Sequence, residues 1–268
     1  MSLSEDQVRA AGAALYEAEQ SCQQIGILSL QYPEMSMEDA YRIQADFTAR
    51  KAAAGAKVVG WKIGLTSKAM RDALKIDIPD SGILFDDMVF ENGCTVPRGR
   101  FIQPRIEAEI AFVMKEALAG PSVTRDQVVA ATDYVAPALE ILDTRIQRVD
   151  AATGAIRKIV DTIADNAANA GIVMGPERHS VADVDLRWAG AIVARDGEVE
   201  ETGLGAGVLD DPALAIAWLA NRLAEHGMAI APGQVVLSGS FIRPIEAHSG
   251  SLIEADFGNF GHVSCRFA

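Results

Sequence analysis

Two patterns of apolar residues divide the chain near residue 56. Before that point, apolar residues recur every three or four positions, which is the spacing of a helix that buries one face. The residues with this spacing are Val8, Ala11, Leu15, Ala18 and Cys22. A second helix is predicted from Ser36, because Ser36-Met37-Glu38-Asp39 has the form of a capping box. We therefore expect an N-terminal helical extension over residues 1–55 that forms a lid or collar, and a β-rich unit over residues 56–268.

From Lys57 onward, short β-branched runs separated by Gly, Pro and Asp predict strands. The predicted strands are Lys57–Leu65, Ile106–Met114, Tyr134–Leu142, Leu186–Arg195, Glu198–Thr202, Val235–Ser238, Leu252–Phe257 and Val263–Phe267. They are too closely spaced for a sheet that alternates with helices. The fold class expected is α+β, with a large mixed or antiparallel sheet and one structural unit after residue 56.

One helix interrupts these strands. Asp211 is its predicted N-cap, Pro212 its first residue and Gly227 its stop. Its predicted inner face consists of Leu214, Ala217 and Trp218. This helix is expected to cover one side of the sheet.

Composition and charge narrow the possible environments and partners. With 49% hydrophobic and 23% charged residues, the chain has the balance of a globular protein. A net charge of −13 disfavours nucleic acid and anionic membranes as partners. The three cysteines lie far apart and form no CxxC pair, which fits a reducing compartment. With neither a secretory signal nor a membrane-spanning run in sight, a cytoplasmic location is expected.

Three glutamates occupy unusual places in the predicted strands. Alternation along Arg105–Val113 puts Glu107 and Glu109 on one face, opposite the apolar face. Glu140 lies deep in an apolar run, where a carboxylate must be paired, protonated or bound to a cation. A solvated acidic strand face is the alternative interpretation, and for an isolated Glu-x-Glu pair it is the more common one. If the three converge, a hard divalent cation such as Mg²⁺ or Mn²⁺ would relieve their repulsion.

A lysine between two glycines is a second candidate for chemistry. Lys62 lies between Gly60 and Gly64 on a predicted strand, so a ligand or another backbone has room to approach it. A lysine supplies a positive charge for a carboxylate and, when desolvated, an acid or base. A surface lysine on a sheet face remains the alternative.

Two loop segments carry further polar groups. Asp80, within Ile78–Gly82, has the surroundings of an ordinary turn aspartate. The segment 238–244 follows an apolar strand and offers hydroxyl groups and the guanidinium of Arg243. It predicts either a carboxylate-binding loop or a surface hairpin.

Stretches along almost the whole chain resemble the 2-oxo-hept-3-ene-1,7-dioate hydratases of the fumarylacetoacetate hydrolase superfamily. The stretches that carry the resemblance are KIGLTSKAM, PRIEAEIAFV, ATDYVAPALEILD, DTIADNAANAG, DLRW, ETGLGAGVL, GSFIRP and SCRF. The resemblance implies a mixed β-roll or sandwich core with an N-terminal helical region, a Mg²⁺ site and a homo-oligomer. It also implies hydration of a small 2-oxo dicarboxylate in the catabolism of aromatic compounds through homoprotocatechuate.

The resemblance also assigns roles to individual residues. The family's metal ligands fall on Glu107, Glu109 and Glu140. Its catalytic lysine falls on Lys62, and the carboxylate that handles protons and water falls on Asp80. Residues expected to contact the substrate are Thr66, Lys158, Ser240 and Arg243.

Related families define the alternatives. The 4-oxalocrotonate decarboxylases look similar but typically lack both an acid at the position of Asp80 and the arginine of the GSF-x-RP loop. The 2-hydroxypentadienoate hydratases keep the acid and lack that loop. Because this chain has both Asp80 and Arg243, the resemblance favours a dicarboxylate hydratase. Ile242 stands where the family has threonine, in the distal part of the expected pocket.

A non-catalytic scaffold that pairs with a pathway decarboxylase is the alternative outside enzymes. The intact acids and lysine argue against it, because a scaffold has no need of them.

Overall fold

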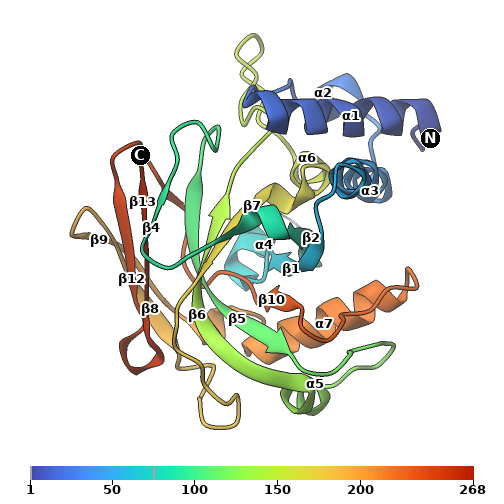
Figure 1. Cartoon of the computed structure of the whole chain (residues 1–268). Helices are drawn as coiled ribbons and strands as arrows, with labels where there is room; N and C mark the ends of the chain where they lie inside the picture. The colour runs from blue at the N-terminus through green and yellow to red at the C-terminus, as the bar shows by residue number, and fades with distance from the viewer. Residues whose placement is uncertain (1, 75) are drawn as a thin grey trace.

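The computed structural model describes residues 2–74 and 76–268, which form two β-sheets and a set of helices (Figure 1). The helices are α1 (Glu5–Ser21), α2 (Leu28–Gln31), α3 (Met37–Ala53), α4 (Lys68–Leu74), α5 (Arg125–Ala131), α6 (Ile159–Ala164) and α7 (Pro212–Ala224). The large sheet contains β1 (Val58–Gly64), β2 (Asp80–Phe85), β3 (Val89–Phe90), β5 (Arg105–Met114), β6 (Thr132–Leu142), β7 (Asn169–Met174), β10 (Val235–Leu237) and β11 (Ile245–Glu246). The smaller sheet contains β4 (Cys94–Val96), β8 (Gly190–Arg195), β9 (Glu198–Leu204), β12 (Leu252–Asp256) and β13 (His262–Phe267).

The large sheet is mixed and is built around one long antiparallel pair. Its order is β2-β1-β10-β5-β6-β7-β3, with β11 also paired to β5. The pairs β1–β10 and β3–β7 are parallel, whereas the central strands β5 and β6 are antiparallel from Arg105–Leu142 to Met114–Thr132. The smaller sheet, β4-β13-β12-β8-β9, lies beside the large one (Figure 1). The predicted α+β class with a mixed β core is confirmed.

The N-terminal helices form a layer at one end of the molecule (Figure 1). The second predicted helix begins as expected, because Ser36 closes a capping box, and Ser4 closes another at the start of α1. Leu15 and Phe47 are among the apolar residues that α1 and α3 bury in a core shared with Ile163 of α6. The helical extension is present, while the division of the chain into units 1–55 and 56–268 stays a prediction.

Several element boundaries differ from the sequence-based prediction. The strand expected from Leu186 begins only at Gly190, because the chain turns over the preceding residues. Helix α7 has the predicted Asp211 cap, Pro212 start and Gly227 stop: regular helix ends at Ala224, and Gly227, with φ of 69°, closes the last turn by donating its N–H to the C=O of Ala224. Leu214 was predicted to face inward and is 40% exposed. The buried face of α7 is instead formed by small and branched residues: Ala213, Ala215, Ile216, Ala217, Leu219, Ala220 and Leu223.

Candidate metal centre and active site

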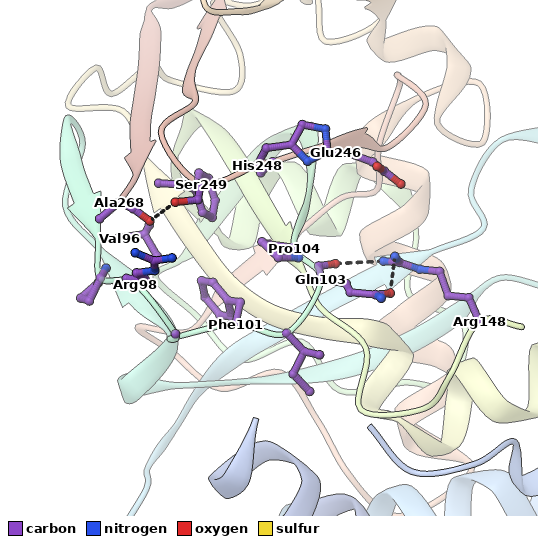
Figure 2. Close-up of a pocket in the computed structure, with 15 residues that line it drawn as sticks. Val96, Arg98, Phe101, Gln103, Pro104, Arg148, Glu246, His248, Ser249 and Ala268 are labelled. Carbon is purple, nitrogen blue, oxygen red and sulfur yellow. Dashed lines mark hydrogen bonds between the residues drawn. The ribbon is translucent and has the colours of Figure 1, made fainter. Parts of the chain in front are cut away.

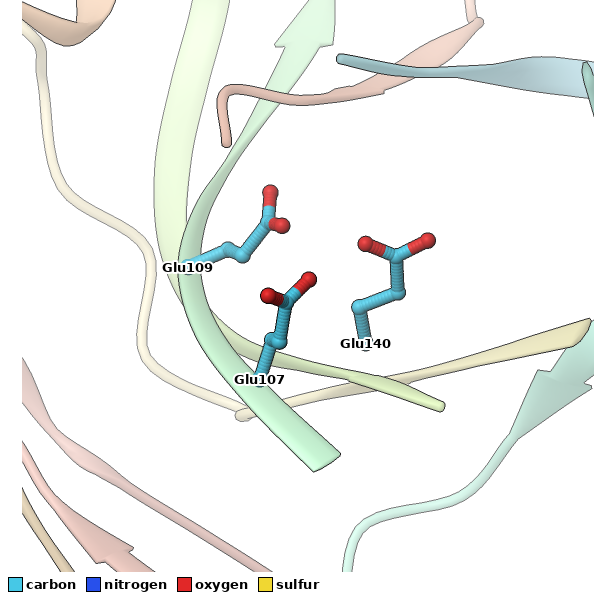
Figure 3. A group of neighbouring side chains, drawn as sticks. All are labelled: Glu107, Glu109 and Glu140. Atoms are coloured by element: carbon cyan, nitrogen blue, oxygen red, sulfur yellow. The ribbon is translucent and has the colours of Figure 1, made fainter. Parts of the chain in front are cut away.

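Pairing of β5 with β6 brings the three glutamates together. Glu107 lies directly opposite Glu140, and Glu109 follows two residues later on the same face of β5 (Figure 3). One carboxylate oxygen from each residue lies within 4.8 Å of the other two. The expected convergence is thus present. Like charges opposite each other in a sheet are unfavourable, so this glutamate cluster of Glu107, Glu109 and Glu140 needs compensation.

The cluster is poorly satisfied by the protein itself. Glu109 and Glu140 are fully buried, and Glu107 is half-buried. Oε2 of Glu109 accepts a hydrogen bond of 2.7 Å from the backbone N–H of Gly239. Its Oε1 and both oxygens of Glu140 have no hydrogen-bond partner among the described residues. Buried acceptors of this kind, gathered in one place, suit a cation.

Burial and mutual repulsion disturb the protonation of all three acids. Burial, followed by the charge of Glu140, raises the pKa of Glu107 to about 8. The same two causes raise the pKa of Glu109 well above its usual range. Burial also raises the pKa of Glu140, against the opposing charge of Lys62. Three hard oxygen donors with space between them fit a divalent ion such as Mg²⁺ or Mn²⁺.

Lys62 lies beside this cluster in the middle of β1. Its side chain is buried, and Nζ lies 3.5 Å from Oε1 of Glu140. Although burial alone lowers the pKa of Lys62, the charges of Glu140, Asp80, Glu107 and Glu109 raise it above the ordinary value. The surface-lysine alternative is therefore wrong.

The glycines next to Lys62 make room for two different groups. A Cβ on Gly60 would lie 1.9 Å from the backbone oxygen of Val235, so β10 approaches there. A Cβ on Gly64 would lie 2.1 Å from Oδ1 of Asp80 and 3.1 Å from Nζ of Lys62. The space above Gly64 is therefore filled by the carboxylate of Asp80, which lies next to the lysine.

Asp80 is not the turn residue that its local sequence suggests. It is the first residue of β2, paired in register with Gly64, and it is buried. Burial raises the pKa of its carboxyl, while Lys62 and a hydrogen bond from the N–H of Gly64 act in the opposite direction. Oδ1 has no hydrogen-bond partner among the described residues. A buried carboxyl with one free oxygen and a raised pKa is suited to proton transfer.

An unusual backbone turn supports the strand that carries Asp80. Asn166, Ala167 and Ala168 all have left-handed backbone angles, with φ of 53°, 53° and 58°. Such a conformation costs about 1–2 kcal/mol per non-glycine residue. Two hydrogen bonds of the Asn166 side-chain amide offset part of this cost. The amide accepts from the N–H of Ile83 at 2.8 Å and donates to the C=O of Ile83 at 2.9 Å. The turn therefore acts as a partner for the edge of β2.

These groups open onto a cavity of about 350 Å³, a size suited to a small organic ligand. Predicted site residues that line it are Lys62, Thr66, Asp80, Glu107, Ser240 and Arg243. Ile242, the departure noted from the sequence, also lines it. Residues 240–244 of the predicted segment 238–244 thus form a loop at the cavity rather than a hairpin on the surface.

Two of the expected substrate contacts differ from the sequence-based picture. Lys158 is exposed at the N-terminal cap of α6 and does not line the cavity, whereas its neighbour Arg157 does. Arg243 lines the cavity, but its side chain is 81% exposed and its Nε donates to Glu201 at 2.8 Å. No periodic pattern marks Arg157 in the sequence, so sequence reasoning missed it.

A separate cavity of about 420 Å³ is lined by most residues of the loop 97–104 (Figure 2). Arg98, Arg148, Glu246 and His248 are the charged and imidazole side chains around it, together with apolar groups such as Phe101. None of the predicted site residues lines this cavity.

Among the described residues, no helix is long and apolar enough to cross a bilayer. The predicted cytoplasmic location and the predicted homo-oligomer stay predictions.

Comparison with known proteins gives the family. No family model matches the chain. The chain is 49% identical to 2-oxo-hept-4-ene-1,7-dioate hydratase from Escherichia coli, over 94% of this chain and 95% of that protein. It is similar in structure to 4-oxalocrotonate decarboxylase from Pseudomonas putida G7, complexed with magnesium and adipate, with a TM-score of 0.93, 36% identity and 99% of both chains covered. Fumarylpyruvate hydrolase from Pseudomonas aeruginosa shares the fold, with a TM-score of 0.61, 15% identity and coverage of 78% and 88%. The predicted family is therefore confirmed, and the chain belongs to the family that contains these hydratases and 4-oxalocrotonate decarboxylases.

Proposed function

We propose that this enzyme hydrates 2-oxo-hept-3-ene-1,7-dioate to 4-hydroxy-2-oxo-heptanedioate, with Mg²⁺ as its cofactor. The observation that carries the proposal is the glutamate cluster beside the buried pair Lys62 and Asp80. The similar hydratase from Escherichia coli supports the reaction type. We place this reaction in the catabolism of aromatic compounds through homoprotocatechuate.

The metal would be held by Glu107, Glu109 and Glu140. When bound, it would orient the 1-carboxylate and 2-oxo group of the substrate and polarise that oxo group. The decarboxylase of similar structure was complexed with magnesium, which supports Mg²⁺ here, and Mn²⁺ has the same preference for oxygen donors.

Lys62 and Asp80 would handle the protons. Lys62 is placed next to Glu140, so its ammonium can donate a hydrogen bond to a substrate oxygen that gains negative charge. Asp80 offers a buried carboxyl with a free Oδ1, which can give a proton to carbon or take one from water. The two groups thus cover the acid and base roles that hydration requires.

The position of the double bond follows from the same proton chemistry. A 2-oxo-3-ene loses a C5 proton, and a 2-oxo-4-ene loses a C3 proton, to give the same 2-hydroxy-2,4-diene. Proton transfer at C5 therefore converts the diene to the conjugated 3-ene ketone. Water then adds with its hydroxyl on C4, and the remaining proton goes to C3.

The cavity supports a dicarboxylate substrate in an acidic protein. Arg157 and Arg243 both line it, so a cation is available for the carboxylate that is not at the metal. The decarboxylase relative is the competing activity within the family. The buried Asp80 favours hydration, because the resemblance places an acid at this position in the hydratases and not in the decarboxylases.

The test is to follow the conjugated chromophore of the substrate with the purified enzyme. We expect rapid loss in Mg²⁺, and loss at least a hundredfold slower after treatment with EDTA or in Glu107→Ala. Restoring Mg²⁺ should rescue the EDTA-treated wild type but not the variant. A rate that neither EDTA nor the substitution changes would contradict the metal-dependent function.

A further inference from the structure

We propose that Arg157 binds the substrate carboxylate that lies farthest from the metal site and so makes the enzyme selective for dicarboxylates. The inference rests on the proposed function and names the residue that binds the second carboxylate of the substrate. It replaces the sequence-based assignment of this role to Arg243.

Arg157 differs from the other cations that line the cavity in having no carboxylate partner within the described part of the chain. Its guanidinium donates to the hydroxyl group of Thr144, and no carboxylate of the described residues lies within ion-pair distance. By contrast, Lys62 contacts Glu140 and Arg243 contacts Glu201. Arg157 is half-buried and has no anionic partner among the described residues, so a substrate carboxylate can form a charged hydrogen-bonded pair with it.

The electrostatic surroundings point the same way. Burial lowers the pKa of Arg157, and the charges of Arg105 and Arg145 lower it further, against Asp165 and Asp161. A bound anion would reverse this effect by stabilising the charged guanidinium. Arg157 therefore gains more from an incoming carboxylate than a solvated arginine does.

One cavity connects the glutamate cluster with Arg157. Glu107 lies opposite Glu140 on β6, and β6 ends at Leu142. The guanidinium of Arg157 contacts Thr144, two residues beyond that end, and lines the same cavity as Lys62 and Asp80. A substrate held at the metal by its first carboxylate would pass its reacting carbons alongside Asp80 and end at the guanidinium.

Arg243 is the weaker candidate for this role. It is mostly exposed at the mouth of the cavity, and Glu201 already holds its guanidinium. A carboxylate that approached Arg243 would have to displace Glu201 or accept its repulsion. Exposed ion pairs of this kind contribute little to binding.

The chain supplies a matched control on the same segment. The backbone N–H of Arg157 donates to the C=O of Arg148 at 3.0 Å, in a short arm closed by the bridge between Val149 and Ile156. Arg148 lines the other cavity, where it donates to the side chain and backbone oxygen of Gln103 (Figure 2). Arg148 and Arg157, which are neighbours across one arm, thus line two different cavities.

The experiment compares kcat/KM for 2-hydroxyhepta-2,4-diene-1,7-dioate and for the monocarboxylate 2-hydroxypenta-2,4-dienoate. In Arg157→Gln, the preference for the dicarboxylate should fall by roughly a hundredfold, mainly through KM, because one charged hydrogen-bonded pair is lost. Arg157→Lys should restore part of the preference. Arg148→Gln should keep the wild-type ratio, and thermal melts establish that each variant is folded.

Three results would overturn the inference: an equal loss for both substrates in Arg157→Gln, the same change of ratio in Arg148→Gln, or a ratio that depends on Arg243 instead. Calorimetric binding of adipate and of hexanoate, with Mg²⁺ present, separates this inference from the reaction. If wild type hydrates neither substrate, the proposed function fails. Even then, the inference requires that Arg157→Gln weaken the binding of adipate much more than the binding of hexanoate. Equal weakening of the two would contradict it.

Discussion

Replacing Glu109 by glutamine separates two effects that the glutamate cluster combines. The side chain is fully buried, with Oε2 bound to the N–H of Gly239 and Oε1 without a hydrogen-bond partner among the described residues. Glutamine has the same shape and can keep the acceptor toward Gly239. Its NH₂ group then replaces a repelling oxygen with a donor. The substitution should therefore stabilise the metal-free protein and weaken metal binding.

The gain in the metal-free protein comes from lost repulsion. Two unit charges 4.8 Å apart repel by about 3.5 kcal/mol at an effective dielectric constant of about 20. Protons held by the cluster already relieve part of this near neutral pH. We therefore expect Glu109→Gln to raise stability by about 1–3 kcal/mol, with the larger gain above about pH 8, the pKa of Glu107. That corresponds to an increase in Tm of roughly 3–8 °C.

The loss in the metal-bound protein follows from mass action. With Mg²⁺ at about 100 times its Kd, wild type gains about 2.7 kcal/mol on binding. If the variant binds about a hundredfold more weakly, the same Mg²⁺ concentration adds only about 0.4 kcal/mol. The shift in Tm caused by Mg²⁺ should thus fall from about 5–10 °C to about 1 °C.

The assay is a series of thermal melts of EDTA-dialysed protein with increasing Mg²⁺. Glu198→Gln, an exposed glutamate on β9, is the matched control and should behave as wild type in both respects. If the metal-free Glu109→Gln variant is less stable than metal-free wild type, repulsion within the glutamate cluster does not have the predicted effect. A full Mg²⁺ shift in the variant would show that Glu109 is not a ligand.

Further predictions concern pH, packing and a buried ion pair. The metal-free protein should lose stability as pH rises from about 5 to about 8, because the folded glutamate cluster holds protons that the unfolded chain has released; melts with Mg²⁺ should show a flatter profile. Gly64→Ala should lower kcat at least tenfold, since its Cβ would lie 2.1 Å from Oδ1 of Asp80, whereas Gly26→Ala, with open space around it, should keep the wild-type rate in the same kinetic assay. Arg145→Met should cost about 3–5 kcal/mol, because Asp165 would lose its buried partner; urea unfolding measures this, and a loss below about 1 kcal/mol would argue against it.

The sequence predicted those features that depend on local pattern. Alternation along β5 placed Glu107 and Glu109 on one face, and the apolar run of β6 marked Glu140 as buried. The capping box at Ser36 also appeared as expected. The register that sets Glu107 opposite Glu140 is a long-range pairing, so no local pattern contains it.

Other features depended on contacts that the sequence does not display. The stretch Pro79–Gly82 has the composition of a turn, yet Asp80 begins a strand because β1 pairs with it and the amide of Asn166 binds its far edge. Arg157 belongs to an arm outside both sheets, where neither strand nor helix periodicity applies. Tertiary contacts therefore decided the parts of the site that local propensity could not predict.

The central claim is that this enzyme adds water to a 2-oxo-enoate, and the most direct test is to identify the product by mass spectrometry. Purified enzyme with Mg²⁺ is given 2-hydroxyhepta-2,4-diene-1,7-dioate in water enriched with heavy oxygen. We predict a product that has gained one water, with the heavy oxygen at C4 and no release of carbon dioxide. A product that has lost carbon dioxide, or substrate recovered without added water, would contradict it.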